Sequence, residues 1–168
     1  MRILGIDPGY AIVGYGVVDY DGLHFNVVGY GAITTDAGVP FPERLKAIYD
    51  DMCTVINKYK PDCMSIERLY FNTNTTTAID VAEARGVILL SAKQNSLDIY
   101  EYTPLQVKQS ITGYGKAEKR QVMEMVKNLL SLSSVPKPDD TADALALTIC
   151  HGHSAGSLYG KLMKGKNK

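Results

Sequence analysis

The sequence lacks three features: a long apolar run, a paired set of cysteines and any net charge. Its first apolar run, Ile3 to Ile6, is too short for a signal peptide, and no segment reaches the roughly 20 apolar residues of a membrane-spanning helix. The three cysteines, Cys53, Cys63 and Cys150, are odd in number and are not spaced as a zinc site requires. We therefore expect a cytoplasmic protein with free, mostly buried thiols.

Charge does not point to a nucleic-acid partner by itself, because 18 basic side chains balance 18 acidic ones. The distribution is nevertheless uneven. Residues 105–128 hold five basic and two acidic side chains, and residues 154–168 hold four lysines and no acid. A solvated helix face and a solubilising tail account equally well for these lysines, so any function has to be argued from other residues.

The length of 168 residues and the 45% hydrophobic content predict one globular domain, over residues 1–153. Residues 154–168, rich in glycine and lysine, are predicted to form a disordered basic tail. Asp21-Gly22 predicts a two-residue hairpin turn. The order of elements is typical of an α/β fold with a mixed sheet. Strands are predicted over 2–6, 12–20, 23–33, 62–67 and 98–102, and helices over 40–60, 78–94, 104–109, 117–131 and 139–151.

Four carboxylates are candidates for a metal site. Asp7 and Glu67 each end an apolar predicted strand, and strand ends in α/β sheets line the crevice where ligands bind. Asp140 and Asp143 are three residues apart on a predicted helix, so both project from one face. Carboxylates gathered at one point repel one another unless a cation intervenes, and their hard oxygens suit Mg²⁺ or Mn²⁺. Two such ions about 4 Å apart could clamp a phosphate and activate a water molecule.

Each of these acids also has a purely structural interpretation. Asp7 precedes Pro-Gly, where aspartate is a common turn residue. Glu67 could form an ion pair with Arg68. Asp140 could cap its helix, and an aspartate such as Asp143 on a surface helix is usually only solvated. The individual signals are weak, so the argument depends on their joint order and sequence context.

Six short segments, in order along the chain, carry a resemblance to a known family. They are Ile3–Gly9, Ile66–Glu67 followed by Phe71, Ala84–Val87, Gln106–Gln109, Gly113–Lys119 and Asp140–Ala146. From about residue 1 to residue 153, the sequence resembles the RuvC-type Holliday-junction resolvases of bacteria. Asp-Pro-Gly alone is not specific, whereas six segments in this order are highly specific.

The resemblance implies an RNase H-like fold, with a mixed five-stranded sheet flanked by helices. It implies that Asp7, Glu67, Asp140 and Asp143 are the catalytic acids and hold Mg²⁺, or Mn²⁺ as a substitute, with two ions per active site. The implied activity is a structure-specific endodeoxyribonuclease that resolves Holliday junctions by paired cuts in two strands of like polarity during recombination and repair. The implied partners are four-way junction DNA, a second copy of the chain and the RuvAB branch-migration complex.

The symmetry of the substrate also predicts a homodimer, since a four-way junction has near two-fold symmetry and one site cuts one strand. The helix after Thr77, rich in small residues, could pack against its mate or equally well against its own sheet.

Four residues are candidates for contact with DNA. Phe71 could stack on an unpaired base, a contact worth roughly 1–3 kcal/mol, or could anchor its loop in the core. The resemblance favours the DNA role. It also matches Lys108 and Lys119 to basic positions that hold phosphates near the site. Lys116, in a glycine-rich loop, could follow the DNA backbone.

Three other functions compete with junction cleavage. ATPases of the actin and sugar-kinase type also begin with a strand, an Asp-x-Gly turn and a hairpin, but they need two such domains and this chain provides one. A non-catalytic junction-binding module could lose the acids, and all four are present here. An RNase H-like nuclease acting on another nucleic acid, such as RNA, is the third alternative.

Overall fold

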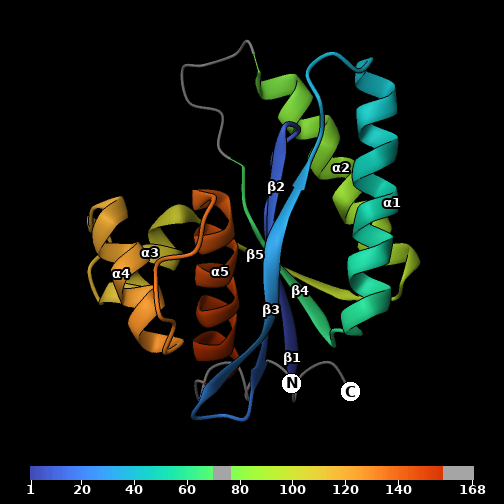
Figure 1. Cartoon of the computed structure of the whole chain (residues 1–168). Helices are drawn as coiled ribbons and strands as arrows, with labels where there is room; N and C mark the ends of the chain where they lie inside the picture. Colours follow the sequence, from blue (N-terminus) through green and yellow to red (C-terminus); the bar gives the residue numbers. More distant parts are fainter. Residues whose placement is uncertain (70–76, 157–168) are drawn as a thin grey trace.

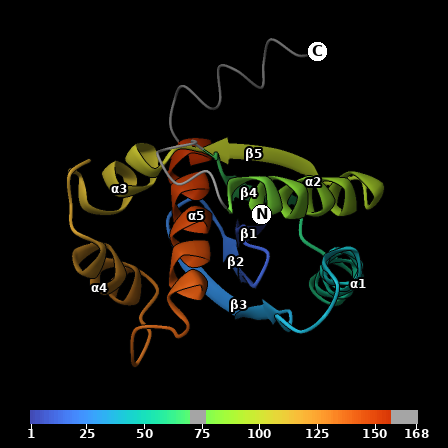
Figure 2. The same cartoon turned by 90° about the horizontal axis from the view of Figure 1, so that it is seen from above.

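The structure is a computed structural model that describes residues 1–69 and 77–156. These residues form one sheet with helices on both faces (Figures 1 and 2). The strands are β1 (Arg2–Asp7), β2 (Ile12–Tyr20), β3 (Phe25–Thr34), β4 (Cys63–Glu67) and β5 (Asp98–Tyr102). The helices are α1 (Phe41–Tyr59), α2 (Ala78–Gln94), α3 (Pro104–Thr112), α4 (Lys119–Leu129) and α5 (Asp139–Gly156).

The five strands have the spatial order β3-β2-β1-β4-β5. β1, β2 and β3 form an antiparallel meander, and β4 and β5 run parallel to β1. The predicted mixed five-stranded sheet is therefore confirmed. Ile6 of β1 pairs with Ile66 of β4, so the residues that follow them, Asp7 and Glu67, end neighbouring strands at the same edge of the sheet.

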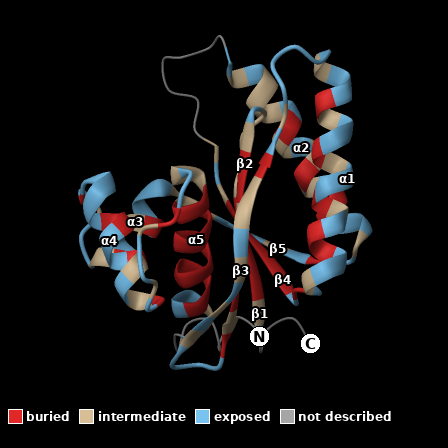
Figure 3. Cartoon of the chain, viewed as in Figure 1, coloured by how far each residue is buried: buried red, intermediate tan, exposed pale blue. Residues whose placement is uncertain are grey.

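Two hydrophobic layers hold the helices on the sheet, and the buried residues line its two faces (Figure 3). On one face α1 and α2 pack on β1 and β4 through side chains that include Leu4, Ile48 and Ile88. On the other face α5 lies against the sheet, and α3 and α4 cover α5 through Val107 and Val126. Figure 2 shows α1 and α2 on one side of the sheet and α3, α4 and α5 on the other.

Helix α5 is enclosed by protein along most of its length. Every residue from Thr141 to Gly152 is buried except Asp143. One face of this helix packs on the sheet, and α3 and α4 pack against other parts of its surface. From Thr141 to Gly152, Asp143 is thus the one residue that remains partly accessible to solvent.

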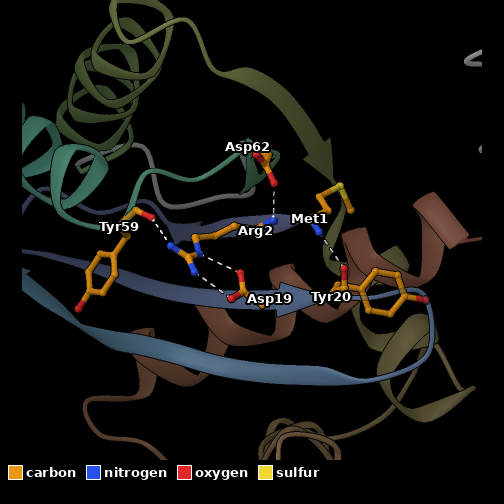
Figure 4. Close-up of polar contacts among 6 residues, drawn as sticks. All are labelled: Met1, Arg2, Asp19, Tyr20, Tyr59 and Asp62. Atoms are coloured by element: carbon orange, nitrogen blue, oxygen red, sulfur yellow. Dashed lines mark hydrogen bonds and ion pairs between the residues drawn. The ribbon is translucent and has the colours of Figure 1, made fainter.

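A cluster of polar contacts fixes the first strand at its starting end (Figure 4). The Arg2 guanidinium donates to both carboxylate oxygens of Asp19, at 2.8 and 2.9 Å, and to the backbone oxygen of Tyr59 at 2.8 Å. The backbone N–H of Arg2 donates to Asp62 at 2.6 Å. These contacts join β1 to β2 and to the segment after α1, at the opposite end of β1 from Asp7.

The first hairpin differs from the prediction. Tyr20 pairs with Phe25, so four residues and not two connect the strands. The carboxylate of Asp21 accepts hydrogen bonds from the backbone N–H groups of Leu23 and His24, both at 2.8 Å. This side-chain bonding replaces strand pairing at the turn, which explains why β3 begins at Phe25 and not at Leu23.

Two helix boundaries also differ. Helix α3 runs to Thr112 and ends at Gly113, which has a left-handed φ of 74°, so it is three residues longer than predicted. Helix α5 runs to Gly156, five residues beyond the predicted end, and includes residues that we had assigned to the tail. Its last turns pack on the hairpin, since a Cβ on Gly152 would lie 2.4 Å from the Phe25 ring. Tertiary packing therefore extends a helix that local sequence does not.

Candidate active site

Asp7 and Glu67 lie on the face of the sheet that α5 covers. Alternate residues of a strand point to the same face. Gly5, two residues before Asp7, lies under the backbone of α5. Ser65, two residues before Glu67, donates its hydroxyl to the backbone oxygen of Leu147 on α5 at 2.9 Å. Both acids therefore point toward the helix that carries the other two.

Two glycines allow the backbone of α5 to approach the sheet closely. A Cβ on Gly14 would lie 2.0 Å from the carbonyl oxygen of Asp140, and a Cβ on Gly5 would lie 2.0 Å from that of Ala144. No side chain could occupy either position without moving the helix. Because Gly14 pairs with Asp7 across β2 and β1, this contact puts the first turn of α5 beside the end of β1.

Asp7 lies close enough to the other three acids for their charges to affect its ionisation. Burial, the largest cause, and the negative charges of Asp143, Glu67 and Asp140 together raise the pKa of Asp7 to about 8. The positive charge of Lys119 opposes this rise. The fold therefore brings the other three predicted acids near Asp7, although the four come from three elements that are distant in sequence.

Glu67 shows the same effect. Burial raises its pKa, and the charge of Asp143 raises it further, whereas Lys119 and Lys108 lower it. Asp7 and Glu67 are thus both partly removed from water next to other acids, an environment in which a carboxylate stays ionised only with help from a cation.

Lys119, at the start of α4, provides such a cation. Its ammonium nitrogen lies 2.9 Å from Oδ2 of Asp143 and 3.8 Å from Oδ2 of Asp139. Asp139 also pairs with Lys137 at 2.7 Å. The sequence predicted Lys119 as a phosphate contact near the site, but its ion pair with Asp143 was not foreseen, because the two residues lie on different helices.

A pocket opens beside these acids. Its lining combines charged groups from the sheet edge and three helices with an apolar wall that we had not assigned to the site. The lining residues are Glu67, Pro104, Val107, Lys108, Lys119, Val122, Asp143 and Leu147. Helical periodicity identified Val122 as inward-facing, yet only the packing of α4 against α5 shows that it borders a pocket.

The remaining predicted site residues lie elsewhere. Lys116 is exposed in the segment between α3 and α4 and does not line this pocket. Phe71 lies outside the described residues. The alternative ion pair between Glu67 and Arg68 is absent from those found within residues 1–69 and 77–156. Instead the Nε of Arg85, on α2, donates to the backbone oxygen of Glu67 at 3.3 Å.

The donor set fits a hard divalent cation in its chemistry. Asp7, Glu67, Asp140 and Asp143 offer only carboxylate oxygens, the ligands that Mg²⁺ and Mn²⁺ prefer. The nearby negative charges that raise the pKa of Asp7 would be offset by a bound cation. Within the part of the chain that the structure describes, no three acidic, histidine or cysteine side chains are already grouped as metal ligands.

Comparison with known proteins gives a consistent result. The family model described as crossover junction endodeoxyribonuclease RuvC matches residues 3–151. A protein of that name from Ruminiclostridium cellulolyticum is 56% identical over 162 residues, which cover 95% of this chain and 98% of the relative. The relative from Alkaliphilus metalliredigens is 58% identical over 154 residues, covering 92% of this chain and 94% of its own length.

Solved structures agree with the sequence relatives. Thermus thermophilus RuvC in complex with Holliday junction substrate is 30% identical and superposes with a TM-score of 0.86, covering 95% of this chain and 98% of the other. The yeast mitochondrial Holliday junction resolvase Ydc2, at 14% identity, shares the fold with a TM-score of 0.68 over 98% of this chain and 84% of its own. The predicted RNase H-like fold is confirmed, and this chain belongs to the RuvC family of crossover junction endodeoxyribonucleases.

Proposed function

We propose that this protein cuts Holliday junctions by divalent-metal-dependent hydrolysis of phosphodiester bonds, with paired cuts in two strands of like polarity. One observation carries the proposal: Asp7, half-buried at the end of β1, experiences the charges of Glu67, Asp140 and Asp143 together. The relatives are named as crossover junction endodeoxyribonucleases, and a related structure was solved with a Holliday junction. Recombination and DNA repair are the processes that need this reaction.

Asp7, Glu67, Asp140 and Asp143 are the residues that would hold Mg²⁺, or Mn²⁺ in its place, with two ions per site. When bound, such ions neutralise the phosphate and lower the pKa of a coordinated water. The protein's own side chains supply the remaining interactions. Asp7 and Glu67 are half-buried, so once a bound cation favours their ionised forms, their charges would be poorly screened by water and would act strongly on that cation.

The two pocket lysines have distinct roles in this proposal. Lys108 and Lys119 bind the strand to be cut through its phosphates, and their charge offsets the negative charge that develops during hydrolysis. Lys119 must first leave Asp143, its partner in the structure. Lys116, exposed nearby, follows the DNA backbone, and Phe71 stacks on an unpaired base at the junction, as the family resemblance implies.

A homodimer with α2 at its interface would bring two sites to two strands. Ile79 and Leu90 of this helix are 68% and 52% exposed, although both are large and apolar. Gly86 has open space where a side chain would be. These three residues lie on one face, since seven and eleven residues correspond to about two and three helical turns. An exposed apolar stripe around a glycine suits close contact with a second copy of the same helix.

Other parts of the proposal rest on the family and on composition. The RuvAB branch-migration complex is the expected partner that moves the junction to the site. Cys53, Cys63 and Cys150 are not joined by disulfides, as a reducing cytoplasm would leave them. Across residues 1–69 and 77–156, no helix combines the length and apolar character of a membrane span. The nuclease domain would extend to the end of α5 at Gly156, and the lysine-rich residues 157–168 would follow it.

A gel assay with a synthetic four-way junction tests the function. The purified protein should cut two strands symmetrically with Mg²⁺ and bind without cutting in EDTA. Linear duplex of the same sequence and an RNA–DNA hybrid serve as competing substrates. Preferential cutting of the hybrid would instead favour an RNase H-like nuclease for another nucleic acid, and junction binding without cutting in Mg²⁺ would favour a binding module.

A further inference from the structure

A second pocket lies at the same edge of the sheet as the proposed active site. Its lining comes from the end of β4, from α2 and from β5, and consists of Arg68, Leu69, Ala82, Arg85 and Glu101. None of these residues lines the pocket that holds Asp143 and Lys119. The proposed mechanism does not use it, although Arg68 directly follows Glu67 in the chain.

The two pockets open on opposite faces of the sheet. Glu67 points toward α5, whereas its neighbour Arg68 lines the pocket on the side of α2. The backbone N–H of Arg68 donates to the carbonyl oxygen of Tyr102 at 2.8 Å, which continues the pairing of β4 with β5. The arginine therefore leaves a fixed backbone position next to the catalytic acid, and a strand that crosses this edge can contact both.

Of the two arginines in this pocket, only Arg85 forms an ion pair with a described residue. Nη2 of Arg85 lies 2.7 Å from Oε2 of Glu101, and the Arg85 side chain is only 14% exposed, so this pair is internally neutralised. Arg68 is exposed and has no ion pair with any residue of the described segments. An exposed guanidinium beside a neutral pair matches a single phosphate, which it can bind through two parallel hydrogen bonds.

The position of the pocket indicates which phosphate it would bind. Ala82 and Arg85 flank the exposed stripe of α2, and Ala82 lies one turn from Ile79. In a dimer formed through α2, the pocket would adjoin the interface and its two-fold axis, because Ala82 and Arg85 belong to that helix. The DNA that runs from one site toward the other across that axis contains the exchange point of the junction.

We propose that Arg68 binds a backbone phosphate of the junction on the exchange-point side of the cut, in the pocket formed with Arg85 and Glu101. This inference rests on the proposed function, because it assigns a further DNA contact to the same substrate. Arg68 is a binding residue in it. Arg85 holds the wall in place through its contacts with Glu67 and Glu101.

The test measures junction binding by fluorescence anisotropy in EDTA, over a range of salt concentrations, for the wild-type chain and three variants. Each lost phosphate contact reduces the slope of log K against log salt by about 0.9. Arg68→Ala should therefore lower the slope by about 0.9 and weaken binding about 3- to 10-fold at moderate salt. Arg68→Lys should keep the slope. Lys58→Ala removes one exposed cation near the end of α1 and should change neither quantity.

Junctions in which single phosphates are replaced by uncharged methylphosphonates locate the contact. One replacement next to the exchange point should weaken junction binding by the wild-type protein and leave binding by Arg68→Ala unchanged. A wild-type slope in Arg68→Ala, or equal sensitivity of both proteins at every position, would overturn the inference. Thermal melting of each variant excludes unfolding as the cause. If the wild-type protein neither binds nor cuts the junction, the proposed function itself fails, a result distinct from a failure confined to Arg68.

Discussion

The ammonium nitrogen of Lys119 lies 2.9 Å from Oδ2 of Asp143, so a cation of the chain itself is paired with an acid that we assign to metal binding. Lys119 is the first residue of α4, Asp143 is the fifth residue of α5, and both line the pocket. A cation that binds at Asp143 must compete with this ammonium. A DNA phosphate, by attracting Lys119, would release the acid. Metal binding and DNA binding are thereby coupled through one side chain.

Lys119→Met should therefore increase the affinity of the DNA-free protein for Mn²⁺ while slowing junction cleavage. An ion pair of this exposure is worth at most about 1 kcal/mol, so we expect affinity to rise about 2- to 5-fold, as measured by electron paramagnetic resonance of free Mn²⁺. Lys108→Met is the matched control, because Lys108 lines the same pocket without an ion pair to a described acid. Unchanged or weaker Mn²⁺ binding in Lys119→Met would contradict the coupling.

Asp7→Asn should abolish cleavage and leave junction binding nearly intact. The amide keeps the shape of the side chain but removes a charged metal ligand, and a loss of at least about 100-fold in the cleavage rate is expected. Single-turnover cleavage in Mg²⁺ and binding in EDTA measure the two effects separately. A variant that still cuts at the wild-type rate would show that Asp7 has only the turn role.

The stability of the metal-free protein should fall as pH rises. Folding raises the pKa of Asp7 from its ordinary 3.8 to about 8, so between these values the unfolded chain releases a proton that the folded chain retains. The free energy of unfolding therefore decreases across this window, and the rise in the pKa of Glu67 acts in the same direction. Thermal denaturation in EDTA at several pH values measures the trend.

In the same experiment, Asp7→Asn should be more stable than the wild-type chain near pH 8, by roughly 1 kcal/mol or more, which corresponds to about 2–4 °C for a domain of this size. The two proteins should converge near pH 4. Addition of Mg²⁺ should raise the melting temperature of the wild-type protein more than that of the variant. Identical pH profiles for the two chains would exclude a perturbed Asp7.

Gly14→Ala tests how α5 is positioned. The added methyl group would lie 2.0 Å from the carbonyl oxygen of Asp140, so the helix must shift, at a cost of about 1–3 kcal/mol. Because the shift moves Asp140 relative to Asp7, cleavage should fall by more than the folded fraction does. Gly38→Ala, whose nearest contact is 3.8 Å away, should leave both properties unchanged. If activity falls only as much as the folded fraction does, Gly14 does not position Asp140 for catalysis.

Leu90→Glu tests the dimer. Leu90 is 52% exposed on α2, and a charge there would be buried without a partner if two copies of the helix meet. Sedimentation equilibrium should show a dimer for the wild-type chain and a shift of at least about tenfold toward monomer for the variant. Leu23→Glu, at an 83% exposed position in the first hairpin, is the control. A dimer in Leu90→Glu as strong as in the wild type would place the interface elsewhere.

Local sequence patterns predicted the strands and helices of the described residues, and the errors at their ends have a common cause. Apolar periodicity, composition and turn residues located these elements, because each signal is set by neighbours within a few turns. The extension of α5 to Gly156 was missed because packing of Gly152 against Phe25 depends on a distant hairpin. The four-residue turn was missed because the carboxylate of Asp21, and not Gly22, organises it.

The sequence by itself determined which residues could do the chemistry: four acids with metal-binding character, at two strand ends and on one helix, in the order typical of the RuvC family. Only the tertiary structure decided their environment. It placed the half-buried Asp7 near three other acids, paired Lys119 with Asp143, and left Arg68 without an acidic partner within the described residues. Ionisation and ion pairing depend on distances between elements that are far apart in sequence, and those distances exist only after the sheet and its helices have packed.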